Sequence, residues 1–245
     1  MVLDIVIMAA GKGTRMKSAL PKVLHRLAGK SLLQHVLETA AGLGADRTVV
    51  VTGHGAEAVE REVAAIDAAA VCVRQMPQLG TGHAVQQALP ALHDEGTTLI
   101  LNGDVPLTRP ATVRALLDAC AGERLALLTL TVADATGYGR VIRDGDRVTA
   151  IVEHKDASAE QRRIGEFYTG LMAVPTAALR RWLAALTNDN AQGEYYLTDI
   201  VAMAVAQGVS VVAVAAPNET EVLGVNSPLQ LADLERRYQT AMPKR

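Results

Sequence analysis

Three cationic side chains lie close to a short glycine-rich segment that follows an apolar run. Asp4–Met8 has the composition of a buried strand, and Ala9-Ala10-Gly11-Lys12-Gly13 comes directly after it, with Arg15 and Lys22 shortly beyond. A small-residue turn leaves backbone N–H groups free to approach a phosphate, whose charge the cations would neutralise. The pattern indicates a polyphosphate site, and the alternative is an ordinary strand-to-helix turn with solvated basic side chains.

Two better known phosphate-binding motifs do not fit this chain. A dinucleotide fingerprint needs a third glycine at position 16, which is occupied by Met16. A Walker A loop that includes Gly29-Lys30-Ser31 needs a glycine at position 24, which is occupied by Leu24. The glycine turn is therefore neither motif, and Gly29-Lys30-Ser31 is interpreted as leading into a helix.

A carboxylate follows a second apolar strand. Thr98–Leu101 is followed by Asn102-Gly103-Asp104, which places the Asp104 side chain at the carboxyl edge of a sheet, where open α/β folds bind ligands. Mg²⁺ prefers hard oxygen ligands and often takes only one or two from the protein. Asp104 is therefore a candidate metal ligand, and the alternative is an aspartate that initiates a turn before Pro106.

Hydrophobic periodicity predicts the elements that position these residues. Ser31–Leu43 has a serine that suits a helix N-cap, one apolar face, and Gly42 and Gly44 at its end. Strands alternating with helices indicate an α/β fold with a parallel sheet. The expected buried strands of this half are Asp4–Met8, Thr48–Thr52, Ala70–Val73, Thr98–Leu101 and Leu125–Val132.

The pattern changes in the second half of the chain. Tyr138–Arg143 and Arg147–His154 alternate in polarity around Asp144-Gly145-Asp146, which predicts an antiparallel hairpin. The remaining expected elements are a strand at Phe167–Val174, a helix at Thr176–Leu186, a helix at Thr198–Ala206, a strand at Val209–Ala215 and a closing helix from Ser227.

Composition excludes several classes of function. The 245 residues are 49% hydrophobic and carry a formal net charge of -2, so the chain has no general electrostatic attraction for nucleic acid or an anionic membrane. No apolar run reaches the roughly 18 residues that a membrane-spanning helix needs. Cys72 and Cys120 have neither disulfide-framework nor zinc spacing. We therefore expect a cytoplasmic protein with no nucleic-acid or membrane partner.

Eight short strings occur in one order along the chain, and together they resemble one bacterial family. The strings are Met8-Ala-Ala-Gly-Lys-Gly-Thr-Arg-Met16, Pro21-Lys22-Val23-Leu24, Gln78-Leu-Gly-Thr-Gly-His-Ala84, Gly103-Asp-Val-Pro106, Thr136-Gly-Tyr-Gly-Arg140, Ile151-Val-Glu-His-Lys-Asp156, Asn190-Ala-Gln-Gly-Glu-Tyr-Tyr-Leu-Thr-Asp199 and Gly224-Val-Asn226. Over nearly the whole chain they are similar to the uridylyltransferase domain of bacterial bifunctional N-acetylglucosamine-1-phosphate uridylyltransferase/glucosamine-1-phosphate acetyltransferase. The first string alone is typical of sugar-nucleotidyltransferase-like folds in general, whereas the third and seventh are specific to this family.

The resemblance implies a Rossmann-like nucleotidyltransferase fold, with a mostly parallel mixed sheet, helices on both faces and an inserted antiparallel hairpin. It implies one domain over 1–245, with 1–110 mainly binding nucleotide, 111–226 mainly binding sugar and 227–245 forming a C-terminal helix. The implied reaction is Mg²⁺-dependent uridylyl transfer from UTP to N-acetylglucosamine 1-phosphate. Its products would be pyrophosphate and UDP-N-acetylglucosamine, a peptidoglycan precursor.

The resemblance also implies roles for individual residues. Arg15 and Lys22 match catalytic residues that act on the phosphates, and Asp104 and Asn226 match the metal-binding pair. The implied UTP-binding residues are Ala9, Ala10, Gly11, Gly13, Lys22, Gln75, Gly80 and Thr81. The implied sugar-binding residues are Asn102, Gly103, Gly139, Glu153, Tyr168, Glu194, Tyr196 and Thr198.

Two residues depart from the family pattern on the sugar side. The family usually has tyrosine where this chain has Asn102, and asparagine where it has Tyr168. We hypothesise that the two residue types have traded places across one pocket, which still holds a sugar but prefers another 2-substituent. The alternative is neutral change around an intact site, because water often replaces a direct hydrogen bond.

The third departure is length. The family continues into a β-helix acetyltransferase domain, and the sequence has no hexapeptide repeat of that kind before it ends at Arg245. That activity is not expected here, and the oligomeric state is left open. Three functions remain: an active uridylyltransferase, a nucleotide-binding protein that has lost turnover, and a related nucleotidyltransferase with another acceptor.

Overall fold

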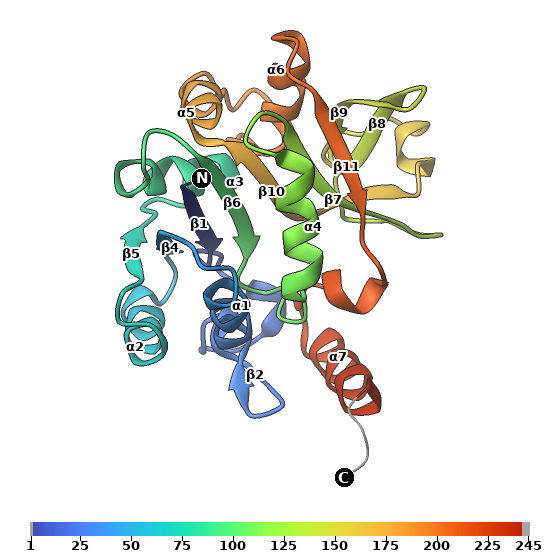
Figure 1. The fold of residues 1–245 in the computed structure, drawn as a ribbon. Coiled ribbons are helices and arrows are strands. Elements are labelled where there is room, and N and C mark those ends of the chain that lie inside the picture. The colour runs from blue at the N-terminus through green and yellow to red at the C-terminus, as the bar shows by residue number, and fades with distance from the viewer. Residues whose placement is uncertain (1, 242–245) are drawn as a thin grey trace.

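A nine-stranded sheet forms the centre of the computed structural model, which describes residues 2–241 (Figure 1). Seven strands lie side by side in the order β11-β7-β10-β6-β1-β4-β5. β8 and β9 form a hairpin attached to β10. The strands are β1 (Leu3–Met8), β4 (Arg47–Thr52), β5 (Val71–Arg74), β6 (Thr97–Asn102), β7 (Leu125–Thr131), β8 (Arg140–Asp144), β9 (Arg147–Val152), β10 (Glu166–Pro175) and β11 (Val211–Ala215).

The main sheet is mixed, and one strand makes it so. β1 pairs in parallel with β4 and β6, and the pairs β4–β5 and β7–β11 are also parallel. β10 lies between β6 and β7 and runs antiparallel to both. This confirms the mostly parallel mixed sheet, and every strand expected from the sequence is present, with bounds that shift by up to two residues.

Helices cover both faces of the sheet, as expected (Figure 1). Ile5 and Ile7 of β1 face a core formed with α1 (Leu32–Ala41), α2 (Ala56–Ile66) and α4 (Pro110–Cys120). Val6 points to the opposite side, because successive strand residues alternate between faces. There it joins the core formed with α3 (Thr81–Ala88), α5 (Thr176–Ala184) and α6 (Asp199–Ala206).

The helix predicted from Ser31 is confirmed as α1. The Ser31 hydroxyl accepts a hydrogen bond of 3.0 Å from the backbone N–H of Gln34, and Gly42 ends the helix. Immediately before it, β3 (Lys30–Ser31) pairs with β2 (Arg26–Leu27) in a small separate sheet that the sequence did not predict. Lys30 therefore belongs to a hairpin, and only Ser31 caps the helix.

The hairpin predicted in the second half is also present. Asp144 pairs with Arg147 across a two-residue turn, in which Gly145 adopts φ 58°. β8 joins the main sheet where Arg140 pairs with Phe167 of β10. The hairpin therefore extends the sheet on the side where the second half of the chain folds.

The closing helix, α7 (Pro228–Ala241), packs on the small β2–β3 sheet. Leu234 shares a buried cluster with Met16, Leu27 and Val225. The sequence predicted this helix for 227–245, of which residues 242–245 lie outside the described part of the chain. None of the helices that residues 2–241 form is long and apolar enough to cross a membrane. Short 3₁₀ helices occur at Thr14–Met16, Lys22–Leu24, Leu89–Ala91, Gln161–Arg163 and Glu219–Val222.

Candidate active site

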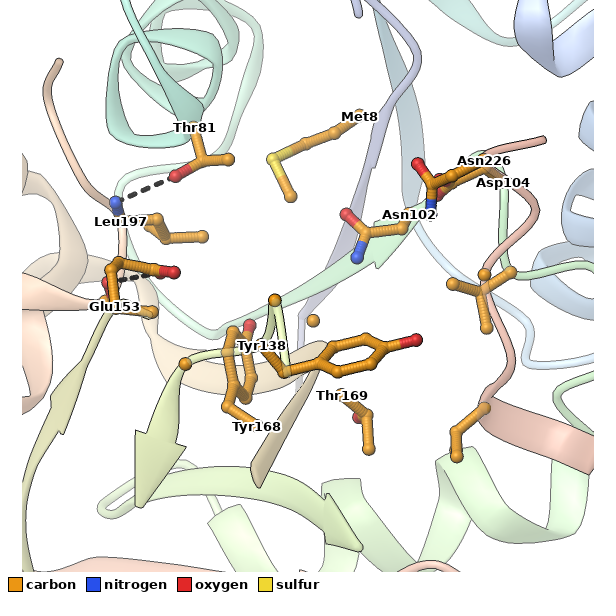
Figure 2. A pocket seen from close by; sticks show the side chains of 17 residues that line it. Met8, Thr81, Asn102, Asp104, Tyr138, Glu153, Tyr168, Thr169, Leu197 and Asn226 are labelled. Atoms are coloured by element: carbon orange, nitrogen blue, oxygen red, sulfur yellow. Dashed lines mark hydrogen bonds between the residues drawn. The ribbon is translucent and has the colours of Figure 1, made fainter. Parts of the chain in front are cut away.

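Two adjoining hollows open at the carboxyl ends of β1 and β6. The larger, here called the turn pocket, has a volume of about 450 Å³ and includes the glycine turn after β1. The smaller, here called the tyrosine pocket, has a volume of about 190 Å³ and includes Tyr138 and Tyr168 (Figure 2). The two pockets share four lining residues, which are Met8, Thr81, Asn102 and Asp104. Ligands in the two pockets would therefore meet near Asp104.

The turn pocket contains most of the residues predicted to bind UTP. Its lining includes Ala9, Ala10, Gly11, Lys22, Gln75, Gly80 and Thr81. It also includes Lys12, one of the three cations of the predicted polyphosphate site, and Gln78, which the resemblance did not assign to UTP. The backbone of the turn and two ammonium groups thus line one hollow, which suits a polyphosphate.

Gly13 does not line either pocket but makes room for a residue that does. Its φ is 59°, a left-handed conformation that favours glycine. A Cβ atom at this position would lie 2.6 Å from Cβ of Lys22. Gly13 therefore allows the Lys22 side chain to lie against the turn.

Gln75 presents one defined end of its amide to the turn pocket. Its side chain is buried, and Nε2 donates to the carbonyl oxygen of Gly80 at 2.8 Å and lies 3.2 Å from Nδ1 of His83. A carbonyl oxygen can only accept, so the end that meets Gly80 must be the nitrogen. The Gln75 side-chain oxygen is the end left to accept a hydrogen bond from a ligand.

The start of α3 is joined to the segment before α6. The Thr81 hydroxyl oxygen accepts a hydrogen bond of 3.0 Å from the backbone N–H of Leu197 (Figure 2). Gly80 has φ 108°, and a Cβ there would lie 2.6 Å from the Tyr195 carbonyl oxygen. Only glycine allows this approach, which holds the wall between the two pockets together.

One ammonium group joins two oxygen-bearing side chains from distant parts of the sequence. Lys22 Nζ donates to Oδ2 of Asp104 at 2.6 Å and to Oδ1 of Asn226 at 3.1 Å. A backbone hydrogen bond of 2.9 Å from Val225 N–H to the Asp104 carbonyl holds the two segments side by side. Three of the residues assigned to the phosphates and metal therefore converge, at the junction of the two pockets.

The Asp104–Asn226 pair fits a divalent cation in geometry and in chemistry. The two oxygens already hold one cationic group, the Lys22 ammonium, between them. Carboxylate and amide oxygens are ligands that Mg²⁺ accepts, and water and phosphates commonly complete its shell. The described residues contain no group of three or more histidine, cysteine, aspartate or glutamate side chains that could hold a metal, so this pair would need ligands from the substrates.

The tyrosine pocket contains five of the eight residues predicted to bind sugar. These are Asn102, Gly139, Glu153, Tyr168 and Thr198. In Figure 2, Glu153 lies at one end, Asp104 and Asn226 lie at the other, and the amide of Asn102 points into the space between. A molecule held by Glu153 would therefore reach toward the metal pair.

Glu153 is the acidic residue at the end of the tyrosine pocket opposite Asp104. Burial raises the pKa of its carboxyl, and nearby carboxylates, Asp199 and Asp156 among them, add to the effect. The Thr198 hydroxyl donates to Oε1 at 3.0 Å, which opposes part of that rise. The other carboxylate oxygen, Oε2, is available to accept from a ligand hydroxyl.

Tyr168 brings a buried hydroxyl group to the same pocket. The residue is 8% exposed, and its hydroxyl oxygen has no hydrogen-bond partner among residues 2–241. Burial raises the pKa of this phenol well above its usual range, so it remains a donor. Buried hydroxyls are rarely left unpaired, so the Tyr168 hydroxyl is a candidate to bond a ligand or a water molecule.

Asn102 packs directly against Gly170. Gly170 has φ 93°, and a Cβ on this residue would collide with the Asn102 amide nitrogen. Gly170 follows Tyr168 in β10, so the strand that carries the tyrosine also leaves space for the asparagine. Both residues that depart from the family pattern therefore line one pocket, from the neighbouring strands β6 and β10.

Besides Gly13, four predicted residues lie outside their expected pocket. Arg15 is exposed in the Thr14–Met16 turn and lines neither pocket, although its charge is near enough to oppose the rise that burial causes in the pKa of Tyr138. Gly103 lies beneath the site, where its N–H donates to the Met8 carbonyl at 2.9 Å. Glu194 lines the turn pocket instead of the tyrosine pocket.

The fourth is Tyr196, whose hydroxyl group is already paired within the protein. It accepts from Nε2 of Gln192 at 2.8 Å and donates to Oδ2 of Asp156 at 3.0 Å. Burial, together with the hydrogen bond to Asp156 and nearby negative charges, raises the pKa of Tyr196 to about 12, although the hydrogen bond from Gln192 opposes part of the rise. Its position suits a support for the 190–199 segment, which in turn contributes Leu197 and Thr198 to the tyrosine pocket.

Sequence reasoning missed several lining residues, of which Tyr138 is the largest. Its ring lies along the tyrosine pocket in Figure 2 and packs on Phe167 with centroids 4.3 Å apart. The signal was available, because Tyr138 belongs to the string Thr136-Gly-Tyr-Gly-Arg140 that supported the resemblance. The other missed residues of this pocket include Val105, Thr169, Gly170, Leu197, Val222 and Gly224.

The chain is similar to curated bacterial proteins over nearly its whole length. The chain is 70% identical over 244 residues to the bifunctional protein GlmU of Methylibium petroleiphilum, a match that covers 97% of this chain and 53% of that protein. It is 64% identical to the protein of the same name from Polaromonas naphthalenivorans, over 97% of this chain and 52% of that protein. The chain thus spans about half the length of the curated relatives it matches.

Solved structures show the same fold at low sequence identity. A UDP-glucose pyrophosphorylase complexed with UDP-glucose superposes with a TM-score of 0.77 at 17% identity, over 99% of this chain and all of that one. A nucleotidyl transferase from Methanothermobacter thermautotroptrophicus gives a TM-score of 0.69 at 21% identity, over 98% of this chain and 99% of that one. Residues 5–202 match the family described as the MobA-like NTP transferase domain. Because that match covers well over half of the chain, the protein belongs to the family of MobA-like NTP transferase domains.

Proposed function

We propose that this protein transfers a uridylyl group from UTP to N-acetylglucosamine 1-phosphate, with Mg²⁺, and releases pyrophosphate. One observation carries the proposal: the turn pocket and the tyrosine pocket meet at Lys22, Asp104 and Asn226. A nucleotide in the first pocket and a sugar phosphate in the second would bring two phosphates together there. The high identity to bifunctional GlmU proteins supports the same reaction.

The reaction needs alignment and charge neutralisation more than it needs a protein base. A sugar-phosphate oxygen is already ionised near neutral pH and attacks the α-phosphorus in line with the departing pyrophosphate. The N–H groups after Ala9 and the ammonium groups of Lys12 and Lys22 offset the charge that moves onto the leaving group. Arg15 lies outside the pocket lining, and we propose that it meets the outer phosphates from the exposed turn.

Asp104 and Asn226 would hold the metal ion, with phosphate oxygens and water as its other ligands. When bound, Mg²⁺ supplies charge neutralisation between two anions that otherwise repel each other. The two side chains are on a strand end and on the segment before α7, and their shared backbone hydrogen bond at Val225 keeps their oxygens in place.

Gln75 supports the choice of uracil. Its free side-chain oxygen can accept from the N3–H of uracil, whereas N3 of cytosine has no hydrogen to donate. An acceptor that faces another acceptor loses a hydrogen bond and leaves buried polar groups unpaired. We therefore propose UTP as the nucleotide substrate.

Glu153 and Tyr168 support a sugar in the tyrosine pocket. The Glu153 carboxylate can accept from sugar hydroxyls, and the Tyr168 hydroxyl can donate to an oxygen of the 2-substituent. Because Asn102 and Tyr168 differ from the family pattern, a second candidate is the same chemistry on a sugar 1-phosphate with another 2-substituent. The ratio of kcat/KM for N-acetylglucosamine 1-phosphate and glucose 1-phosphate decides between the two.

Nucleotide binding and sugar binding are proposed for two successive parts of the chain. Apart from Glu194, the turn pocket is lined from residues 8–104, whereas the tyrosine pocket takes most of its lining from residues 105–226. We propose that 1–110 mainly binds nucleotide and 111–226 mainly binds sugar. UTP and sugar phosphates are compounds of the cytoplasm, which is the compartment we propose for the protein.

A coupled pyrophosphate-release assay tests the proposal with UTP, CTP and GTP against several sugar 1-phosphates. We expect release only with UTP, and fastest with N-acetylglucosamine 1-phosphate. A protein that binds UTP with Mg²⁺ but releases no pyrophosphate with any acceptor would be the nucleotide-binding alternative. The variant Asp104→Ala should stay folded and lose Mg²⁺-dependent turnover, and full activity in that variant would contradict the metal assignment.

A further inference from the structure

Lys22 occupies the position in which a divalent cation is proposed to bind. Its ammonium nitrogen lies 2.6 Å from Asp104 Oδ2 and 3.1 Å from Asn226 Oδ1, the two oxygens assigned to the metal. The contact is sheltered, because the side chains of Lys22 and Asp104 are 16% and 17% exposed. A metal ion bound to both of these oxygens would take the place that the ammonium group now holds between them, and the two positive charges would repel each other.

We propose that Lys22 is an internal competitor, which a divalent cation must displace from Asp104 and Asn226 before it can bind. This inference rests on the proposed function for its choice of metal ligands. The competition has two parts, since the metal replaces the ion pair and is also repelled by the positive charge of Lys22. The free protein therefore binds a divalent cation more weakly than the two oxygens alone would.

The turn pocket can receive the displaced ammonium group of Lys22. Lys22 also lines the turn pocket, next to Ala9, Ala10 and Gly11. A polyphosphate there would attract the ammonium group away from Asp104 and so free both oxygens for the metal. Binding of the nucleotide and of the cation is therefore linked through one side chain, and each favours the other.

The packing around Lys22 supports movement of its end and not of its base. Gly13 lies against Cβ of Lys22, and the neighbouring Val23 is buried, so the first part of the side chain is held. Among residues 2–241, the ammonium group is held only by Asp104 and Asn226, each of which also lines the tyrosine pocket. Rotation of the outer side-chain bonds is enough to transfer the charge from one pocket to the other.

Metal binding without nucleotide tests the proposal directly. Free Mn²⁺ is titrated by electron paramagnetic resonance against the whole protein and against Lys22→Met, which keeps an unbranched side chain one atom shorter and removes the charge. We expect Lys22→Met to bind Mn²⁺ about five- to tenfold more tightly, because a sheltered ion pair and a repulsion are both removed. Lys22→Arg keeps the positive charge and should bind no more tightly than wild type.

Two further variants locate the effect. Lys30→Met removes the same charge and breaks an ion pair with Glu38 at the surface, and it should leave Mn²⁺ affinity unchanged. In Lys22→Met/Asp104→Asn the gain in affinity should disappear, because one of the two ligands has lost its charge. Circular dichroism confirms that each variant is folded before its titration.

The proposal is overturned if Lys22→Met binds Mn²⁺ no more tightly than wild type. It is also overturned if Lys30→Met gains as much, which would show a general effect of net charge, or if the double variant keeps the gain. None of these measurements uses UTP or turnover. A wild-type protein that fails the pyrophosphate assay but shows the Lys22→Met gain would therefore contradict the proposed function and leave the competition standing.

Discussion

Gly13 and Lys22 are spatially matched, since a Cβ at residue 13 would lie 2.6 Å from Cβ of Lys22. Gly13 also has φ 59°, so alanine here meets both a strained backbone and a collision. We expect Gly13→Ala to displace the Lys22 side chain from the turn pocket, where it would meet the phosphates, and to lower kcat/KM by about tenfold or more. Steady-state kinetics with UTP as the varied substrate measure the loss.

The variant Gly145→Ala is a control that has the backbone strain of Gly13→Ala without its steric collision. Gly145 has φ 58°, almost the same as Gly13, but no atom of the described residues lies within 4 Å of a Cβ placed there. Both variants should lose about 1–2 kcal/mol of stability from the backbone conformation. Only Gly13→Ala should lose activity, and an equal loss in Gly145→Ala would show that the effect is one of general stability.

Replacement of Tyr168 by phenylalanine should raise stability and lower activity. The buried hydroxyl of Tyr168 has no partner among the described residues, and an unpaired buried polar group costs about 1–3 kcal/mol. For a chain of this size that corresponds to a rise in Tm of about 2–4 °C for each kcal/mol. We expect kcat/KM for the sugar phosphate to fall by about tenfold, because the ligand loses its donor.

Tyr196→Phe is the matched control for that variant. The hydroxyl of Tyr196 makes hydrogen bonds to Gln192 and Asp156, so its removal should lower Tm. Thermal melts of the two variants should therefore move in opposite directions. A fall in Tm for both would mean that the Tyr168 hydroxyl is satisfied within the protein.

Glu153→Gln should stabilise the protein near neutral pH. The pKa of Glu153 is raised in the folded state, mainly by burial, so the folded protein holds a proton that the unfolded chain has released. Stability is then highest below the ordinary pKa of about 4.3 and falls as the pH rises to the raised pKa. The glutamine variant should be more stable than wild type above that window and equal to it near pH 4, as urea unfolding at several pH values would show.

Glu166 should show the opposite dependence of stability on pH. A paired hydrogen bond from Arg143 lowers the pKa of Glu166, so its contribution to stability is present above its ordinary pKa and lost as the pH falls. Glu166→Gln should therefore be less stable than wild type at pH 7. If Glu153→Gln behaved in the same way as Glu166→Gln, the Glu153 carboxylate would be stabilising and not strained by burial.

Gln75→Leu should lower the preference of the protein for UTP over CTP. Loss of the side-chain oxygen removes the acceptor for uracil, and we expect kcat/KM for UTP to fall by about tenfold or more. Gln75 also holds the Gly80 carbonyl, so some loss with every nucleotide is expected. The ratio of UTP to CTP activity is the deciding measurement, and an unchanged ratio would place base selection elsewhere.

The strands and their ends were predictable because they are continuous β-branched and apolar runs. Asp4–Met8 and Thr98–Leu101 were placed to within one residue at each end, and the polar residues after them were assigned to the sheet edge. That is enough to locate Asp104 and the glycine turn in one site. Local pattern and chain direction determine this part of the fold.

Contacts between distant segments were not predictable in the same way. No local pattern shows that β10 enters the sheet between β6 and β7, or that Tyr196 is tied to Asp156. The resemblance placed Asp104 beside Asn226, but the Lys22 contact between them depends on packing across 204 positions of sequence. Gly13 shows the same limit, because its role comes from the atoms that lie against it.

The position of β10 has a consequence for synthesis on the ribosome. β6 and β7 do not pair with each other, and their common partner emerges only with residues 166–175. A nascent chain that has reached residue 165 can align β1, β4, β5 and β6, but it has an open edge on β6 and no neighbour for β7. Open edges attract other strands. Chaperone occupancy during translation should therefore peak between the emergence of β6 and that of β10.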